Sequence, residues 1–149
     1  MEYYLESYLD PRTIAPEEFH RALQRGRLQV FFSRITRRSC HLLLFETIKK
    51  KLKLVNRVDR GRQEIRLDQI IGSVGKHEIF SQSLLPLADS LEDRWRNIYV
   101  LMQGPRGCPP ISVYQVGDGY FIFDGHHRAS VVRYLGNQVI EAYVIEWTV

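Results

Sequence analysis

The second half of the chain shows the apolar and polar patterns of a small β-sheet. Ile111–Val116 alternates as a half-buried strand does, and the apolar run Tyr120–Phe123 follows the turn Gly117–Gly119, which predicts a β-hairpin. Val139–Val149 alternates again and predicts a last strand. Glu64–Ile71 alternates and then becomes apolar, which is typical of a strand that enters a turn.

The first half repeats its apolar residues at helical spacing instead. Residues 1–10 predict a short helix, which Pro11 interrupts. Ala15–Gly26 has a proline and two acids in its first turn and predicts a second helix that ends at the glycine. A third helical pattern runs from Arg27 to about Leu54, with a break near Thr36–Ser39.

Two further helices and a loop complete the predicted elements. Ser83–Tyr99 has a helical pattern, interrupted by Pro86, and Gly104–Pro110 is a loop rich in glycine and proline. A short helix follows Asp124 and ends at Gly136. The pattern as a whole predicts an α+β or α/β protein, with a small mixed sheet and helices, preceded by a basic helical extension.

Length and composition favour one domain, with or without an extension. The chain has 149 residues, of which 44% are hydrophobic. No stretch reaches the roughly 18 apolar residues of a membrane span, and the first ten residues are unlike a signal peptide. We therefore expect a soluble, cytoplasmic protein with no membrane partner. The two cysteines form neither a disulfide framework nor a metal-ligand spacing.

Positive charge is concentrated in the first half of the chain. Between Arg25 and Arg66 there are 13 Lys and Arg residues against 3 Asp and Glu residues. Such a block is typical either of a nucleic-acid contact surface or of a solvated helix face. The change in charge near residues 56–62 predicts a boundary, with a basic helical extension over 1–60 and a second domain over 61–149.

The stretch Asp124–Gly136, DGHHRASVVRYLG, carries the candidate chemistry. A strand that enters a helix through Asp-Gly exposes the first N–H groups of that helix, and these donors form an anion site together with the helix dipole. Gly125 allows a close approach to the backbone. His126 and His127 can donate hydrogen bonds to phosphate oxygens.

Arg128 lies on the same helical side as the apolar residues that follow it. The helix dipole and desolvation both disfavour an inward cation in a first turn, so Arg128 requires an anion. Asp124 could be that anion, in which case the pair is a structural feature. A ligand phosphate could be the anion instead, which would leave Asp124 free to hold a metal ion or to orient water.

The residues before the predicted helix 83–99 give a weaker signal. Gly72–Lys76 contains two glycines and a lysine, but its spacing is not that of a Walker phosphate loop. Glu78 follows in a segment that we expect beside the sheet. The spacing of His77, His126 and His127 does not support a zinc site.

Residues 63–149 resemble the ParB/sulfiredoxin superfamily. The resemblance rests on the order LDQIIGSVGKHEIF, PPISVY and YFIFDGHHRASVVRYLG. It implies a small α/β domain in which the Gly-x-x-Arg turn holds nucleotide phosphates, here through Gly125, His126, His127 and Arg128. Sulfiredoxins have a catalytic cysteine where this chain has His126, so sulfinic acid reduction is not expected. The partitioning proteins have Gly-Glu-Arg-Arg in this turn, which also differs.

The Asp-Gly-His-His-Arg turn is most similar to that of free-serine kinases and of ParB-like nuclease proteins. By this similarity Asp124 would act at Mg²⁺ or at the phosphoryl group, and Glu78 would be the general base. The cofactor would be Mg²⁺ with ATP, ADP or CTP. Phosphoryl transfer or nucleotide hydrolysis is the first hypothesis.

Two other functions remain open at this stage. The chain could be a DNA-binding or nuclease-like module that holds the phosphate backbone with the segment Arg25–Arg66. It could also be an interaction domain without chemistry, in which Asp124 and Arg128 pair with each other and no pocket lies above the turn. The sequence leaves open whether the chain forms a homo-oligomer.

Overall fold

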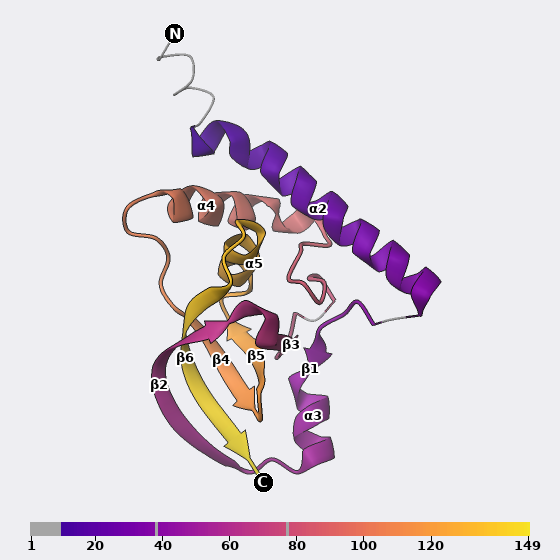
Figure 1. Cartoon of the computed structure of the whole chain (residues 1–149), viewed down its shortest axis with the longest axis vertical. Helices are drawn as coiled ribbons and strands as arrows, with labels where there is room; N and C mark the ends of the chain where they lie inside the picture. Colours follow the sequence, from indigo (N-terminus) through magenta and orange to yellow (C-terminus); the bar gives the residue numbers. More distant parts are fainter. Residues whose placement is uncertain (1–9, 38, 77) are drawn as a thin grey trace.

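The computed structural model describes residues 10–149 except 38 and 77, so the helix expected over residues 1–10 lies outside the described residues. The elements are α2 (Pro11–Thr36), β1 (Leu43–Leu44), α3 (Phe45–Leu52), β2 (Asn56–Arg66), η1 (Leu67–Gln69), β3 (Ile70–Ser73), η2 (Asp89–Leu91), α4 (Glu92–Gln103), β4 (Ile111–Val116), β5 (Gly119–Asp124), α5 (His126–Tyr134) and β6 (Val139–Thr148). Three of these helices, α2, α4 and α5, gather toward one end of a six-stranded mixed sheet, and α3 lies toward the other end (Figure 1).

The sheet has the strand order β1-β3-β5-β4-β6-β2. β4 and β5 form the predicted antiparallel hairpin, and they are flanked by parallel partners, β3 beside β5 and β6 beside β4. β2 closes the other edge, antiparallel to β6. The mixed sheet with helices confirms the predicted fold class. β5 therefore lies inside the sheet, and the turn that follows it begins at a rigid position.

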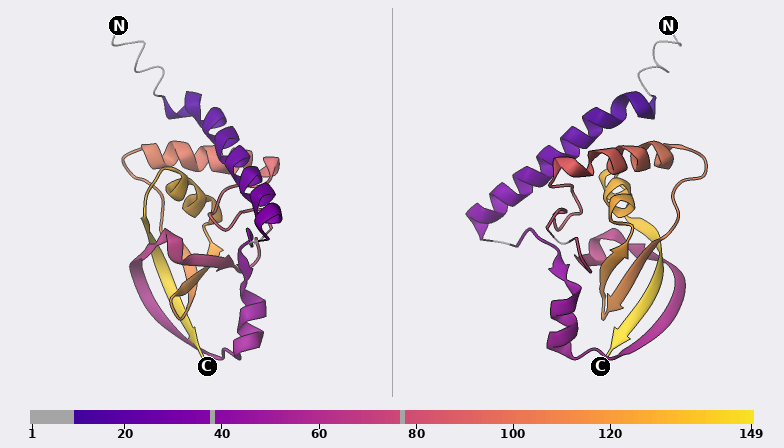
Figure 2. Two further views of the ribbon diagram at one scale, coloured as in Figure 1. Left: turned by 45° about the vertical axis from the view of Figure 1, so that its right-hand side comes forward. Right: turned by 180° about the vertical axis from the view of Figure 1, so that it is seen from behind.

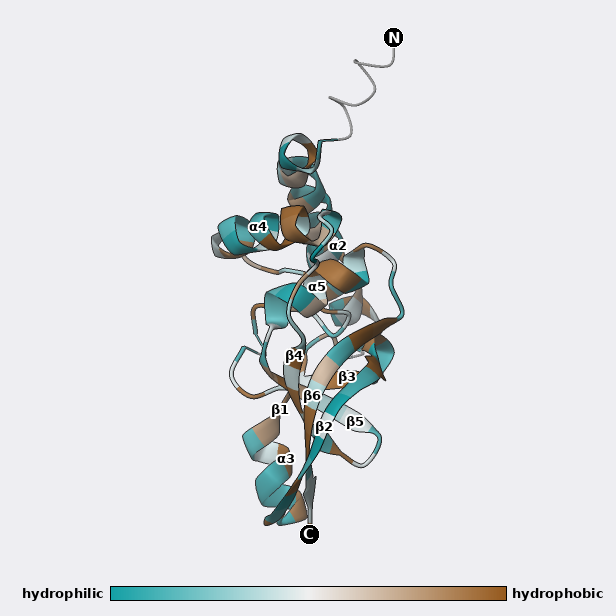
Figure 3. Ribbon diagram, turned by 90° about the vertical axis from the view of Figure 1, so that its left-hand side faces the viewer, coloured by the Kyte–Doolittle hydropathy of each residue, from teal (hydrophilic) through white to brown (hydrophobic). Residues whose placement is uncertain are grey.

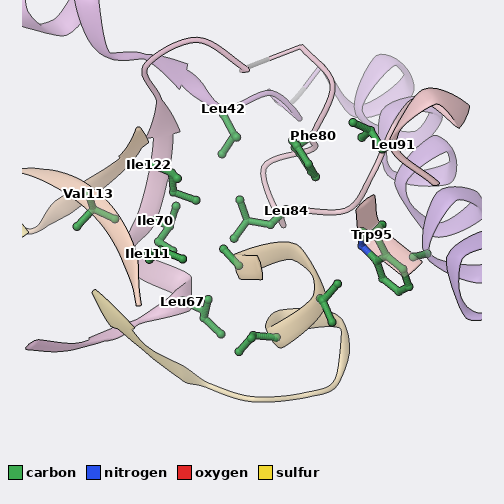
Figure 4. Close-up of a cluster of buried hydrophobic side chains, with 14 of the residues drawn as sticks. Leu42, Leu67, Ile70, Phe80, Leu84, Leu91, Trp95, Ile111, Val113 and Ile122 are labelled. Atoms are coloured by element: carbon green, nitrogen blue, oxygen red, sulfur yellow. The ribbon is translucent and has the colours of Figure 1, made fainter. Parts of the chain in front are cut away.

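The main core lies between the sheet and α5, and it extends to α4 and α2 (Figure 4). Trp95 of α4 is fully buried, and its indole N–H donates to Ser130 of α5 at 3.0 Å. Phe19 of α2 packs edge-on against Trp95, with 5.7 Å between the ring centroids. Burial of these rings contributes about 2–3 kcal/mol per side chain, so α5 is held against α4 and cannot shift independently.

α2 is one continuous helix over Pro11–Thr36, where the sequence predicted a helix that ends at Gly26. Asp10 is the N-cap and accepts a hydrogen bond from the Arg12 amide, and Pro11 occupies the first turn, where its missing N–H costs nothing. Gly26 provides a close packing contact, because a Cβ there would lie 2.5 Å from the Pro86 carbonyl oxygen. The predicted break near Thr36 is confirmed.

The helix expected over Ser83–Tyr99 begins later than predicted, at Glu92. The preceding residues form a compact loop in which Leu84 is fully buried at φ 62° and Phe80 pairs with Pro86 in an isolated bridge. The Ser81 hydroxyl accepts a hydrogen bond from the Leu85 amide at 3.1 Å. Burial of Leu84 and these bonds hold the loop in a non-helical form.

The strand predicted over Glu64–Ile71 is two strands in the structure. β2 covers Asn56–Arg66, and η1 separates it from β3, which begins at Ile70. β2 is an exposed and largely hydrophilic edge (Figure 3), so it lacks an apolar pattern. Arg60 pairs with Glu146 of β6 at 2.9 Å, and Arg62 pairs with Glu141. Residue 60, at the predicted boundary, lies inside this strand, and β1 before it belongs to the same sheet. The division into 1–60 and 61–149 stays a prediction.

The far end of the sheet carries α3 (Figure 2). A second cluster of buried apolar residues lies there. Phe45 packs against Tyr114 and Trp147, with ring centroids 4.8 Å and 5.7 Å apart. The ammonium group of Lys49 lies 4.7 Å from the centre of the Trp147 ring. No helix among the described residues is long and apolar enough to cross a membrane.

Candidate functional site: the start of helix α5

Gly125 joins β5 to α5 in a conformation that other residues rarely adopt. Its φ of 103° is left-handed, and a Cβ there would lie 2.5 Å from Ile111 Cγ2. No side chain of the described residues caps the helix at this position. The first intrahelical bond runs from the Ala129 amide to the Gly125 carbonyl oxygen at 3.0 Å. The amides of His126, His127 and Arg128 therefore have no intrahelical acceptor and form the expected donor set.

A buried serine ties α5 to the loop after β3. The Ser73 hydroxyl oxygen accepts hydrogen bonds from the Gly75 and Lys76 amides, at 3.2 Å and 3.0 Å. It also lies 2.6 Å from His126 Nε2. Because both of its lone pairs are taken, the hydroxyl donates its hydrogen to Nε2, and neutral His126 carries its proton on Nδ1. This serine thereby fixes the position of Lys76 relative to α5.

Both histidines are buried and neutral at physiological pH. Burial lowers the pKa of His126 to about 4, and the positive charge of Lys76 adds to this effect. Burial, Lys76 and Arg94 lower the pKa of His127 to about 4 in the same way. Phe80 stacks on His126 and meets His127 edge-on. Each imidazole can therefore offer one N–H donor at neutral pH but no positive charge.

His127 also has an unsatisfied polar atom. Its Nε2 is buried and has no hydrogen-bond partner among the described residues. An unpaired buried polar atom costs about 1–3 kcal/mol of stability. His127 therefore stabilises the fold less than an apolar residue of the same shape would.

The depressed pKa values predict that stability falls in mild acid. The unfolded chain takes up these protons below about pH 6.5, whereas the folded protein takes them up only below about pH 4. The unfolding free energy therefore decreases as the pH falls from 6.5 to 4, by roughly 2–3 kcal/mol for each histidine. Urea unfolding across this range measures the decrease. In the variant His126→Gln/His127→Gln the unfolding free energy should depend less steeply on pH than in the wild type. An unchanged pH dependence would contradict the low pKa values of the two histidines.

The Ser73 network predicts a stability loss in Ser73→Ala. The substitution removes the partner of two amides and of His126 Nε2 at a fully buried site. We expect the unfolding free energy to fall by about 2–3 kcal/mol in chemical denaturation. Ser81→Ala is the matched control, since the equally buried Ser81 hydroxyl accepts one amide bond, and it should cost less. Equal losses in the two variants would refute the proposed network.

Arg128 points inward, as predicted, and its guanidinium group joins three acceptors. Nη1 donates to the carbonyl oxygens of Pro109 and Pro110, at 3.1 Å and 2.9 Å. Nη2 donates to Asp124 Oδ2 at 3.0 Å. The internal ion pair considered in the sequence is therefore present. The Asp124 side chain is 70% exposed and the Arg128 side chain 16%, so the carboxylate keeps access to solvent while the cation is held in place.

A cavity of about 340 Å³ nevertheless lies above the turn. Its wall combines the start of α5 and the end of β5 with residues from α4 and the loop after β3. The lining residues are Lys76, Arg94, Asn97, Ile98, Phe123, Asp124, Gly125, His126, His127 and Arg128. Three of these side chains are cationic and one is a carboxylate, so the wall is positively charged. Such a wall, with the uncapped end of α5, suits an anion.

The structure brings together most of the predicted site residues and adds others. Gly125, His126, His127, Arg128 and Asp124 all line the cavity. Glu78 is exposed and is not among the described residues of the cavity wall, so its role as a base stays a prediction. His77 lies outside the described residues.

Sequence reasoning missed Arg94 and Asn97, and it found Lys76 only as part of a rejected phosphate loop. The two missed residues lie one helical turn apart on α4 and are exposed, which is the signal that could have marked them as one polar face. Neither Lys76 nor Arg94 forms an ion pair with the described residues. The cavity thus contains two cations, Lys76 and Arg94, that have no ion-pair partner among the described residues.

The basic segment Arg25–Arg66 does not form one face beside this cavity. It is divided between the end of α2, helix α3 and strand β2, and α3 lies at the opposite end of the sheet from α5 (Figures 1 and 2). None of its residues is among the described residues that line the cavity. Arg27, Arg60 and Arg62 form ion pairs with acids of the chain. DNA binding by this segment stays a prediction.

Comparison with known proteins gives a weak likeness to one solved structure. Sulfiredoxin from Arabidopsis thaliana aligns with 56% of this chain and 82% of its own, at 19% sequence identity and a TM-score of 0.42. No protein-family model matches the chain. The curated proteins contain no match either. The functional conclusion therefore depends on the geometry of the site.

Proposed function

We propose that the cavity at the start of α5 binds the phosphate groups of a nucleotide and supports phosphoryl transfer or hydrolysis. The observation that carries the proposal is the convergence of Lys76, Arg94 and Arg128 on a cavity that contains the uncapped end of a helix. Backbone amides and fixed cations are the groups that bind phosphate oxygens and stabilise charge during phosphoryl transfer.

The size and the lining of the cavity support this proposal. A volume of about 340 Å³ lies at the lower end of small-molecule pockets, enough for the phosphate end of a nucleotide. Lys76 and Arg94 would contact the outer phosphate oxygens, because both line the cavity and are free of ion pairs with the described residues. Ile98 and Phe123 provide apolar wall for the remainder of the ligand.

Mg²⁺ fits this site as an ion that arrives with the nucleotide. The described residues contain no group of three or more His, Cys, Asp or Glu side chains placed to hold a metal. Asp124 supplies one exposed carboxylate at the cavity, and Mg²⁺ commonly takes one or two carboxylates together with substrate phosphates. Bound there, Mg²⁺ would neutralise phosphate charge. Asp124 would hold it, while Arg128 fixes the orientation of the carboxylate.

This role predicts a specific effect of Asp124→Asn. Removal of the carboxylate makes the cavity more positive, so binding of ADP without Mg²⁺ should strengthen by about two- to fivefold. The gain in affinity that Mg²⁺ gives the wild type should disappear. Calorimetric titration with and without Mg²⁺ measures both effects. A variant that keeps the full Mg²⁺ effect would show that Asp124 is only the structural partner of Arg128.

Calorimetric titration with ATP, ADP and CTP tests the proposed function. The wild type should bind at least one of them, and Lys76→Ala/Arg94→Ala should lose at least about tenfold in affinity, since each charge-assisted contact contributes about 1.5–3 kcal/mol. Lys50→Ala/Lys51→Ala removes the same charge from exposed positions on α3 and should bind normally. Equal losses in both double variants would mean that net charge, and not this cavity, attracts the ligand.

Release of inorganic phosphate separates chemistry from binding. The same wild-type samples, incubated with the nucleotide that binds best, should release phosphate or transfer it to a small hydroxyl-bearing acceptor. Binding without turnover under any tested acceptor would restrict the proposal to nucleotide binding.

A further inference from the structure

The second half of α2 exposes an apolar stripe. Leu28, Phe31, Phe32 and Ile35 are 54%, 57%, 57% and 64% exposed. Their spacing, i, i+3, i+4 and i+7, places them on one side of the helix. Gly26 is buried against the body of the protein on the opposite side. Figure 2 shows that this end of α2 projects beyond α4. The stripe therefore points away from the domain.

Arginines lie close to the stripe along the chain. Arg25, Arg27 and Arg34 of α2 and its C-cap Arg37 are exposed, and Arg27 also pairs with Asp89 of the same chain. If the stripes of two copies packed against each other, these cations would meet like charges, which is destabilising. The stripe therefore suits an apolar segment that also carries negative charge.

The first ten residues of the chain have that composition. Residues 1–10 include the acids Glu2, Glu6 and Asp10 and no Lys or Arg. Tyr4, Leu5, Tyr8 and Leu9 lie between these acids at positions that would share one side of a helix. Its charge and its apolar residues are thus complementary to the α2 stripe and to the arginines close to it.

The segment cannot cover the stripe of its own chain. α2 begins directly after Asp10, and 18 residues at 1.5 Å each place Leu28 about 27 Å farther along the helix. A fully extended chain of about five residues between Leu5 and Asp10 spans only about 18 Å. Tyr4 and Leu5 would fall short of Leu28, and farther short of Ile35. Only a second molecule can place these residues on the stripe.

We propose that the chain forms a dimer in which residues 1–9 of each copy bind the stripe Leu28–Ile35 of the other. The two contacts are related by symmetry, so each copy gives one acidic segment and receives one, as an isologous dimer requires. The interaction combines burial of the two phenylalanines with charge attraction to the arginines. It does not involve the cavity at α5, so its test is independent of the proposed function.

Light scattering during gel filtration tests the dimer on the full chain. The wild type should elute with twice the mass of one chain at micromolar concentration, and a chain without residues 1–9 should elute as a monomer. Phe31→Ser/Phe32→Ser should also be monomeric. Leu101→Ser, at an exposed apolar position on α4, is the matched control and should remain dimeric. A monomeric wild type, or a dimer that survives deletion of residues 1–9, would overturn the proposal.

Crosslinking between two tagged chains identifies the contact directly. In a background with Cys40 and Cys108 replaced by alanine, Leu5→Cys in one chain and Phe31→Cys in another should form a mixed disulfide on mild oxidation. Leu5→Cys paired with Val58→Cys, on the β2 edge, should not. If the mixed disulfide did not form and the wild type bound anionic phospholipid vesicles, the stripe would serve a membrane surface. That result would contradict the proposed dimer.

Discussion

Gly125→Ala should be the most destabilising single substitution at the site, with the unfolding free energy reduced by roughly 3–5 kcal/mol. The residue has φ 103° and ψ 27°, a conformation in which a side chain costs about 1–3 kcal/mol. The added Cβ would also lie 2.5 Å from Ile111 Cγ2 in the core, and such overpacking costs about as much again. Denaturant unfolding measures the sum.

Gly136→Ala separates the two contributions. Gly136 also has a positive φ, 90°, but a Cβ there would meet nothing within 4 Å. Its substitution should therefore cost only the backbone strain, about 1–3 kcal/mol. If the two alanine variants were equally stable, the close contact between Gly125 and Ile111 of β4 would not restrict the turn. That contact would then not explain why the start of α5 is rigid.

Arg128→Lys should impair both stability and nucleotide binding although it keeps the positive charge. The guanidinium group donates to Pro109, Pro110 and Asp124 at once, and an ammonium group on a flexible stem cannot reproduce this planar arrangement. We expect a loss of about 1–3 kcal/mol in unfolding free energy and at least about tenfold in affinity. Arg128→Ala should lose more, about 100-fold in affinity, since the charge is lost as well.

Arg133→Lys is the matched control for this substitution. Arg133 lies on the same helix, outside the described cavity wall, and its Nη1 donates to the Leu67 carbonyl oxygen at a longer distance, 3.4 Å. It should keep nucleotide binding within about twofold of the wild type. A normal affinity of Arg128→Lys would mean that only its charge matters and that the geometry of the pair with Asp124 does not.

The local part of the site could be predicted from the sequence because its signals are adjacent in the chain. Asp-Gly before a short helix indicates an uncapped helix start, and the helical phase of Arg128 indicates that it points inward. The rest could not be predicted this way. Lys76 and Arg94 reach the cavity from segments about 50 and 30 residues earlier. The contacts of Ser73 with the Lys76 amide and His126 bring Lys76 to it, and the packing of α4 on α5 brings Arg94.

The errors in the predicted elements have a similar cause. Gly26 predicts a helix end by composition, yet α2 uses it to approach the Pro86 carbonyl. β2 has no apolar alternation because its stability comes from backbone pairing with β6 and from cross-strand pairs such as Arg60 with Glu146. Tertiary contacts decide both cases, and a local pattern does not contain them.

A titration followed by amide NMR shifts tests the central claim most directly. Inorganic pyrophosphate, and then the nucleotide that binds best, would be added to the ¹⁵N-labelled full chain. The site predicts the largest shifts at the amides of His126, His127 and Arg128 at the start of α5, with Lys76 next, and saturation with one ligand for each chain. Shifts centred on α3 and β2, or none at the start of α5, would contradict a phosphate site there.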